Sequence, residues 1–89
     1  MRSVSSTTAF RKDVKRAKKR GKDLSKLKKV IDLLIEAVPL PPSYKDHPLH
    51  GEFVGSRDLH IEPDWILIYT ASSDHLRLER TGSHSDLFR

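Results

Sequence analysis

The chain has 89 residues, a formal net charge of +5 and no cysteine. This length fits one small domain, and the absence of cysteine excludes disulfides and thiolate metal sites. No run of residues approaches the roughly 20 apolar side chains of a transmembrane helix, and residues 1–8 lack the apolar segment of a signal peptide. We therefore expect a single cytoplasmic domain over residues 1–89 that does not associate with membranes.

The charge is distributed unevenly along the chain. Residues 1–30 contain 12 Lys or Arg and 2 Asp or Glu, whereas residues 31–89 contain 5 and 10 respectively. A basic block of this kind attracts polyanions, nucleic acids above all. The alternative is that these cations form the solvated face of a helix. In combination with the histidines described below, we favour nucleic-acid binding.

The first half of the chain predicts a short strand followed by two helices. Residues 3–9 are rich in Ser and Thr and form a strand candidate. From Phe10, apolar residues recur at helical spacing among many cations, and Gly21 is a suitable end for that helix. Asp23 can cap the second helix. Its wide apolar stripe makes it the main core helix, with the members Leu24, Leu27, Val30, Ile31, Leu34, Ile35 and Val38.

The second half predicts a sheet. Three prolines between residues 39 and 42 end the second helix and begin an extended loop up to residue 50. Strands are then expected at residues 52–54, 57–62, 65–70 and 75–80. The segment 65–70 is almost continuously apolar, so it should be central and buried on both faces. The order β-α-α-β-β-β predicts an α+β fold, with a small antiparallel sheet packed against an N-terminal helical hairpin.

Histidine side chains can transfer protons near neutral pH, because their unperturbed pKa is about 6.5. Alternation over residues 57–62 places His60 on the outward face beside Asp58 and Glu62. Asp64 follows at the next turn. Two further histidines lie in polar segments at distances that the sequence does not fix, His47 and His84. A histidine in a small protein is usually a surface or structural residue, and we interpret the remaining two in that way, His50 and His75.

The spacing of polar residues limits the types of active site that the chain can form. No His-x-x-x-His spacing indicates a metal site, no nucleophile elbow indicates a Ser-His-Asp system, and no glycine-rich loop is present to bind phosphate. We therefore expect no metal and no cofactor. Metal-free acid–base catalysis on RNA remains, in which the 2′-hydroxyl loses a proton and the leaving 5′-oxygen gains one. Phe88 or Trp65 can stack on a base. Trp65 lies on a buried strand, however, and is better interpreted as a core side chain, and Phe88 can simply close the end of the sheet.

Alternation along residues 75–80 also makes a prediction about Arg80. It places this side chain on the inward side of the strand, together with Leu76 and Leu78. An arginine there needs a partner or a ligand, and a guanidinium can stabilise charge that develops on a phosphate.

Three segments resemble the YafQ family of toxins, which belongs to the RelE/ParE superfamily of toxin–antitoxin systems: DHPL at 46–49, RDLHIEPDWILIY at 57–69 and RTGSHSDLF at 80–88. The resemblance extends from about Phe10 to Phe88. It implies a RelE-like toxin domain and metal-independent cleavage of mRNA within the ribosomal A site. It also implies that the partners are the ribosome with its rRNA, the mRNA, and a cognate antitoxin that neutralises the toxin by binding it.

The resemblance further implies roles for individual residues. The catalytic positions fall on His47, His60, Asp64 and His84. Arg80 and Phe88 match supporting positions at the scissile phosphate and at the base. The basic first helix is expected to contact RNA through Lys15, Lys18, Lys19 and Arg20.

Two other functions remain open from the sequence. A ParE-like toxin that inhibits DNA gyrase would have the same superfamily fold, and it would not need these histidines. A non-catalytic RNA-binding module would use the basic helices alone, and its binding would depend strongly on salt.

Overall fold

The structure of the protein, a computed structural model, describes residues 1–88 apart from the side chain of Glu52. Five strands, three α-helices and two short 3₁₀ helices are present in this part of the chain. In chain order they are β1 (Ser3–Ser6), α1 (Thr8–Lys19), α2 (Leu24–Glu36), η1 (Pro42–Tyr44), β2 (His47–Pro48), η2 (Gly51–Phe53), β3 (Arg57–Glu62), β4 (Trp65–Ala71), β5 (His75–Gly82) and α3 (His84–Phe88). None of these helices is long and apolar enough to span a membrane.

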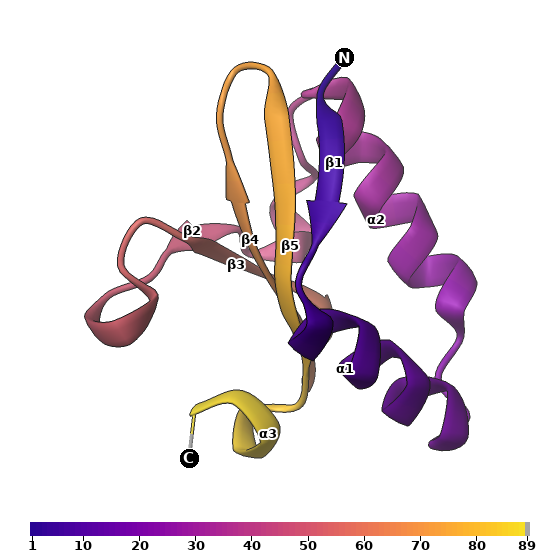
Figure 1. Cartoon of the computed structure of the whole chain (residues 1–89). Helices are drawn as coiled ribbons and strands as arrows, with labels where there is room; N and C mark the ends of the chain where they lie inside the picture. The colour runs from indigo at the N-terminus through magenta and orange to yellow at the C-terminus, as the bar shows by residue number, and fades with distance from the viewer. Residues whose placement is uncertain (89) are drawn as a thin grey trace.

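The five strands form one sheet in the order β1-β5-β4-β3-β2 (Figure 1). Pairing is antiparallel from β2 to β5, whereas β1 pairs in parallel with β5. The predicted α+β fold with its helical hairpin is therefore confirmed, with the difference that the sheet is mixed. The reason is connectivity: a tight hairpin forces antiparallel pairing, but β1 and β5 are separated by most of the chain.

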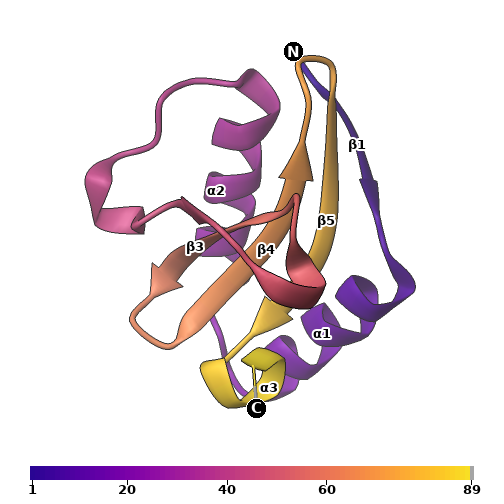
Figure 2. The same cartoon turned by 90° about the vertical axis from the view of Figure 1, so that its left-hand side faces the viewer.

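Strand β4 lies at the centre of the sheet and is buried on both faces, as its apolar run predicts. On one face, Trp65, Leu67 and Tyr69 pack against α1 and α2 in the main core. On the other face, Ile66 and Ile68 pack in a smaller apolar cluster. Figure 2 shows this second face, over which α3 and the segment after β2 lie.

The helix boundaries follow from local signals. Gly21, with φ +79°, turns the chain after α1. The Asp23 carboxylate then caps α2 by accepting a hydrogen bond from the Ser25 backbone N–H at 3.0 Å. Helix α2 ends earlier than its apolar stripe predicts, because Ala37 adopts a left-handed conformation with φ 58°. Val38 consequently lies outside the helix and is exposed, so its assignment to the core was wrong.

The strand predicted at residues 52–54 is not present. This segment lies in and after the 3₁₀ helix η2 instead. The glycines on either side, Gly51 and Gly55, have φ values of +73° and +91°, so the chain turns twice within five residues and cannot extend. The strand next to β3 is formed by His47 and Pro48, which pair with Asp58 and Arg57.

Candidate active site

Three histidines that are distant in sequence lie next to one another. His47 belongs to β2, His60 to β3 and His84 begins α3. The ring centroids are 6.4 Å apart for His47 and His60, and 5.5 Å apart for His60 and His84. Phe88 continues the row, with its ring 6.2 Å from that of His84. His60 pairs with Ile66, so this row of rings lies on the sheet face opposite the main core.

Asp64 holds His84 through two hydrogen bonds. Its Oδ1 atom accepts from the backbone N–H of His84 at 2.9 Å and lies 2.7 Å from His84 Nδ1. The backbone hydrogen bond, followed by that to the imidazole, lowers the pKa of Asp64. An ionised carboxylate only accepts hydrogen bonds, so Nδ1 of His84 carries a hydrogen and Nε2 is the nitrogen left for chemistry.

His47 is oriented in a similar way by a carbonyl group. Its Nδ1 lies 2.8 Å from the backbone oxygen of Lys45, which can only accept a hydrogen bond. Nδ1 therefore carries a hydrogen, and Nε2 of His47 is the free nitrogen. His84 and His47, at the two ends of the histidine row, thus have the same tautomer for the same physical reason.

Asp58 also lies beside the row of histidines, although the sequence indicated no role for it. Its side chain is 5% exposed, and its Oδ1 lies 2.9 Å from His47 Nδ1. No described residue gives this oxygen a hydrogen bond of good geometry, since the imidazole N–H is directed at Lys45. Burial raises the pKa of Asp58, and the nearby histidines oppose that rise. The spacing Asp58-x-His60 was the signal, because residues two apart in a strand share a face.

Arg80 does not lie on the side of β5 that alternation predicts. A β-bulge shifts the register between β4 and β5, so that Tyr69 pairs with Leu78 but Ile68 pairs with Arg80. The buried side of the strand is continued by Thr81 instead, whose hydroxyl accepts a hydrogen bond from the Trp65 indole at 3.0 Å. The prediction that Arg80 points inward was therefore wrong, since a bulge reverses the alternation after it.

The partner of Arg80 is Asp13 of α1. The guanidinium donates from Nε at 2.6 Å and from Nη2 at 3.2 Å to this buried carboxylate. Asp13 also accepts from the Thr81 backbone N–H at 3.1 Å and from Arg16 at 2.9 Å. These bonds fix the guanidinium against α1, and Asp13 does not bind its Nη1 group.

Helix α3, which carries His84 and Phe88, is tied to the end of α1 by Asp86. This carboxylate accepts from Arg20 at 2.7 Å and from the Ser83 backbone N–H at 2.9 Å. In return, the Ser83 hydroxyl accepts from the Asp86 backbone N–H at 3.1 Å, which completes a capping box. The bond to Arg20 is the largest of several causes that lower the pKa of Asp86 strongly. Arg20, predicted to contact RNA, is thus also a structural link.

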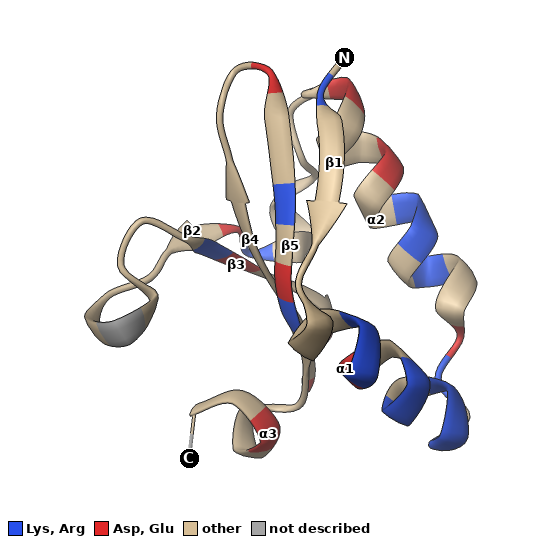
Figure 3. Cartoon of the chain, in the orientation of Figure 1, with Lys and Arg blue, Asp and Glu red and all other residues tan. Residues whose placement is uncertain are grey.

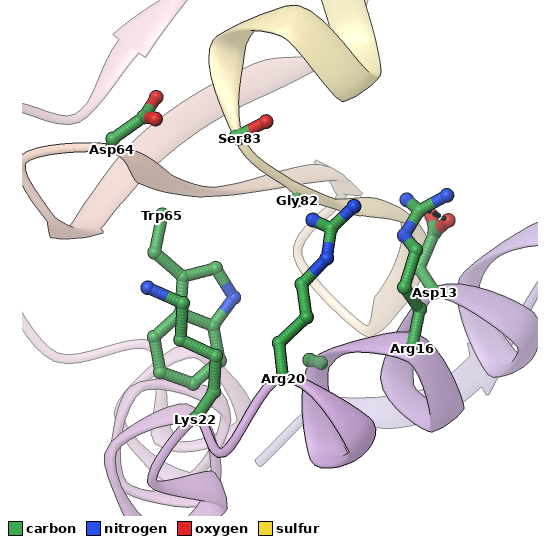
Figure 4. A pocket seen from close by; sticks show the side chains of 9 residues that line it. Asp13, Arg16, Arg20, Lys22, Asp64, Trp65, Gly82 and Ser83 are labelled. Carbon is green, nitrogen blue, oxygen red and sulfur yellow. Dashed lines mark hydrogen bonds and ion pairs between the residues drawn. The ribbon is translucent and has the colours of Figure 1, made fainter.

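A cavity of about 230 Å³ lies between the end of α1 and the turn that carries Asp64. Figure 4 shows Arg16 and Arg20 extending towards the Gly82–Ser83 backbone, with Lys22 beside Trp65. The Lys22 ammonium lies 5.7 Å from the centroid of the indole ring. Trp65 itself is 1% exposed, so it is a core side chain, whereas Phe88 is 40% exposed and borders the row of rings.

The remaining predicted RNA contacts are exposed on α1. Figure 3 shows Lys and Arg concentrated along this helix. Lys15, Lys18 and Lys19 are among its exposed residues. The structure thus brings together His47, His60, Asp64, His84 and Phe88. It places the lysines on a separate helical surface.

The residues that are described contain no group of three or more His, Cys, Asp or Glu arranged to hold a metal ion. The row of rings nevertheless resembles a site for proton transfer, because two oriented imidazoles, at its two ends, have free Nε2 atoms. A row of titratable side chains in a protein that also carries a basic helix favours a protein that acts on nucleic acids.

Comparison with known proteins agrees with this class. A family model described as "Bacterial toxin of type II toxin-antitoxin system, YafQ" matches residues 2–89. The mRNA interferase toxin YafQ of Escherichia coli K12 is 53% identical over 88 residues, which cover 98% of this chain and 96% of that protein. The putative toxin YafQ of Haemophilus influenzae is 37% identical and covers 92% of this chain and 87% of its own.

A solved structure gives the same result at the level of the fold. The toxin chain in the crystal structure of the E. coli DinJ-YafQ complex superposes with a TM-score of 0.93 at 52% identity, and the match covers 100% of both chains. The family model and the superposition identify the protein as a toxin of a type II toxin–antitoxin system. The chain belongs to the YafQ family. This confirms the predicted resemblance and the prediction that the chain is an enzyme.

Proposed function

We propose that this toxin is a ribosome-dependent endoribonuclease that cleaves mRNA in the ribosomal A site by metal-independent acid–base catalysis. The observation that carries the proposal is the row formed by His47, His60 and His84, with centroid separations of 6.4 and 5.5 Å. The name of the E. coli relative, an mRNA interferase, supports the substrate class.

The proposed reaction needs two proton transfers. The RNA 2′-hydroxyl gives up its proton and its oxygen attacks the adjacent phosphorus. The bond from phosphorus to the 5′-oxygen then breaks, and that oxygen takes up a proton. The products are a 2′,3′-cyclic phosphate and a 5′-hydroxyl. The catalytic set consists of His47, His60, Asp64 and His84, in which Asp64 holds the His84 ring by a 2.7 Å hydrogen bond. Each positioned proton transfer typically contributes about 10²- to 10⁴-fold to the rate.

The other proposed contacts concern charge and base stacking. Arg80 stabilises the charge on the reacting phosphate through the part of its guanidinium that Asp13 does not bind. Phe88 stacks on a base beside the histidine row, which its 40% exposure permits. The exposed cations of α1 contact ribosomal RNA, with Lys15, Lys18, Lys19 and Arg20 as the candidates.

We further propose that a cognate antitoxin neutralises the protein in the cytoplasm. The support is the E. coli relative, which has been crystallised with DinJ. Binding of the antitoxin to the folded toxin would raise its midpoint of thermal unfolding, in proportion to the logarithm of the free antitoxin concentration.

The proposal is tested with His84→Ala, compared with His50→Ala as the matched control. In the wild type and in the control, expression should arrest growth, and mapped mRNA ends should lie within ribosome-protected codons. His84→Ala should abolish both effects while its circular dichroism and unfolding midpoint stay close to the wild type. Full toxicity of this variant would overturn the assignment of the site.

Two further outcomes would replace the proposal. Growth arrest with intact mRNA and altered DNA supercoiling would indicate the gyrase-inhibiting alternative. Salt-sensitive RNA binding without cleavage, even with ribosomes present, would indicate a binding module.

A further inference from the structure

The segment that carries His47 is short, and its sheet pairing is minimal. Strand β2 consists of His47 and Pro48 alone, paired with Asp58 and Arg57 at the edge of the sheet. Both residues of β2 are exposed. A two-residue edge strand provides few backbone hydrogen bonds, and proline donates none. Something besides the ladder must therefore keep the His47 imidazole next to that of His60.

The residue before His47 supplies this anchor. One carboxylate oxygen of Asp46 accepts a hydrogen bond from the Tyr69 hydroxyl at 2.5 Å. The guanidinium of Arg57 binds the same carboxylate from Nε at 3.2 and 3.3 Å and from Nη2 at 3.2 Å. Tyr69 belongs to β4 and Arg57 to β3, so Asp46 is attached to the two strands nearest β2.

The two groups that donate to Asp46 keep their protons near neutral pH. Burial and the bond to Asp46 raise the pKa of the Tyr69 hydroxyl, and the bond to Asp46 raises the pKa of Arg57. Both groups consequently remain hydrogen-bond donors throughout the pH range in which histidines titrate. A cluster of this kind can hold a neighbouring imidazole without itself taking part in proton transfer.

The backbone is strained at Lys45, the residue before Asp46. Lys45, whose carbonyl orients His47 Nδ1, has a left-handed conformation with φ 51°. This conformation is unfavourable for a residue with a side chain and persists only where its surroundings impose it. Its backbone N–H donates to Pro42 O at 3.0 Å on one side, and Asp46 is fixed on the other. The bonds of the Asp46 carboxylate thus hold the Lys45 carbonyl in place, and this carbonyl fixes the His47 tautomer.

We propose that Asp46, Arg57 and Tyr69 form a positioning cluster for His47, which fixes its place in the histidine row and presents Nε2 to the substrate. None of the three touches the reacting atoms, so they are positioning residues. The inference rests on the proposed catalytic role of His47. It adds residues at the His47 end of the row, opposite the end at which Asp64 and His84 lie.

The test uses Tyr69→Phe, which removes one hydroxyl and keeps the buried ring. Tyr44→Phe is the matched control, because it removes the other tyrosine hydroxyl of the chain. The first readout is the ¹⁵N and ¹³C NMR spectrum of the imidazoles, which reports the tautomer of each histidine independently of ribosomes and RNA. Tyr69→Phe should convert the Nδ1–H form of His47 into a mixture and leave His84 unchanged.

The second readout is kinetic and uses purified ribosome–mRNA complexes. Tyr69→Phe should lower kcat about 10- to 100-fold while KM changes less than about twofold, because misplacing a catalytic group affects the reaction step more than binding. Tyr44→Phe should change neither constant. Asp46→Asn is the second variant if Tyr69→Phe unfolds, and Asp46→Glu, which restores the charge, should recover part of the loss.

The outcomes separate this inference from the proposed function. An unchanged His47 spectrum in both variants overturns the positioning role, whether or not cleavage falls. A changed spectrum of all three histidines also overturns it, because the effect would then be general. A selective change at His47 with unchanged kcat confirms the positioning but overturns the catalytic role of His47.

Discussion

The two faces of strand β4 are covered by different kinds of structure. Trp65, Leu67 and Tyr69 face the main core under two helices with continuous apolar stripes. Ile66 and Ile68 face a small cluster, in which Leu87 is the other buried member among the described residues. Its partly buried members come from the loop after β2, namely Leu49 and Phe53. One face holds the fold together, and the other attaches the segments that carry the histidines.

This difference indicates how a small domain combines stability with a site. The helix face is stabilised by the burial of apolar surface, which does not depend on the direction of individual contacts. The site face has few such contacts and depends on directional bonds from Asp64 and Asp86. The bonds of Asp46 reach Tyr69 and Arg57 on the helix face instead. Truncation of the apolar side chains on the helix face should therefore lower stability, whereas changes on the site face should lower activity out of proportion to stability.

The largest effect on stability is expected from Leu67→Ala, on the helix face. Leu67 is fully buried at the centre of the sheet. Its truncation should lower the free energy of unfolding by about 2–5 kcal/mol, through lost burial and the cavity left behind. Urea denaturation measures this loss. A loss smaller than that of Leu87→Ala, on the site face, would reverse the comparison.

Leu87→Ala should give an intermediate loss of stability and a larger loss of function. The cluster around Leu87 lies at the periphery, where its neighbours can relax, so we expect about 2 kcal/mol, the low end of the range for such changes. Helix α3 should detach and displace His84 and Phe88. Urea denaturation and a growth-arrest assay measure the two effects. Val38→Ala, at an exposed position, serves as a control that should leave both unchanged.

Asp86→Ala should lower stability by about 1 kcal/mol, because it removes the carboxylate half of the capping box of α3 and the bond to Arg20. The pKa of Asp86 is lowered in the folded state. Its stabilisation is therefore present above the unfolded pKa of about 3.9 and is lost as the pH falls through the folded value. Thermal unfolding of both proteins between pH 3 and 7 should show a difference that shrinks in acid. A constant difference would show that the charge is not responsible.

Asp58→Asn should give the smallest effect, with the opposite sign. Burial raises the pKa of Asp58, so the charged carboxylate at neutral pH opposes folding. Between the unfolded and folded pKa values the folded state binds more protons, and stability rises as the pH falls through this interval. At pH 7, Asp58→Asn should raise the free energy of unfolding by up to about 1 kcal/mol. A lower unfolding midpoint at pH 7 would contradict this expectation.

Several features of the fold could be predicted from local sequence. The cap at Asp23 and the turn at Gly21 depend on neighbouring residues only. The position of β4 at the centre of the sheet follows from its uninterrupted apolar run, which a half-exposed strand could not tolerate. The outward position of His60 followed from alternation in the same way.

Other features depended on contacts that no local pattern encodes. The bulge before Arg80 is set by how β5 pairs with β4, and it reversed the predicted side of that arginine. The edge strand at His47 is too short to have a periodicity. The left-handed residue Ala37 ended α2 before its apolar stripe did.

The sequence by itself determined the two helices, the central strand, the basic front of the chain and, through its resemblance to a family, which histidines to consider. Only the tertiary structure decided that His47, His60 and His84 share one row, that Asp58 is buried beneath it and that Asp46, next to His47, bonds to Tyr69. The physical reason is that these contacts join segments far apart in the chain. Their geometry depends on strand register and on how the loops pack over the sheet, and neither of these produces a periodic pattern in the sequence.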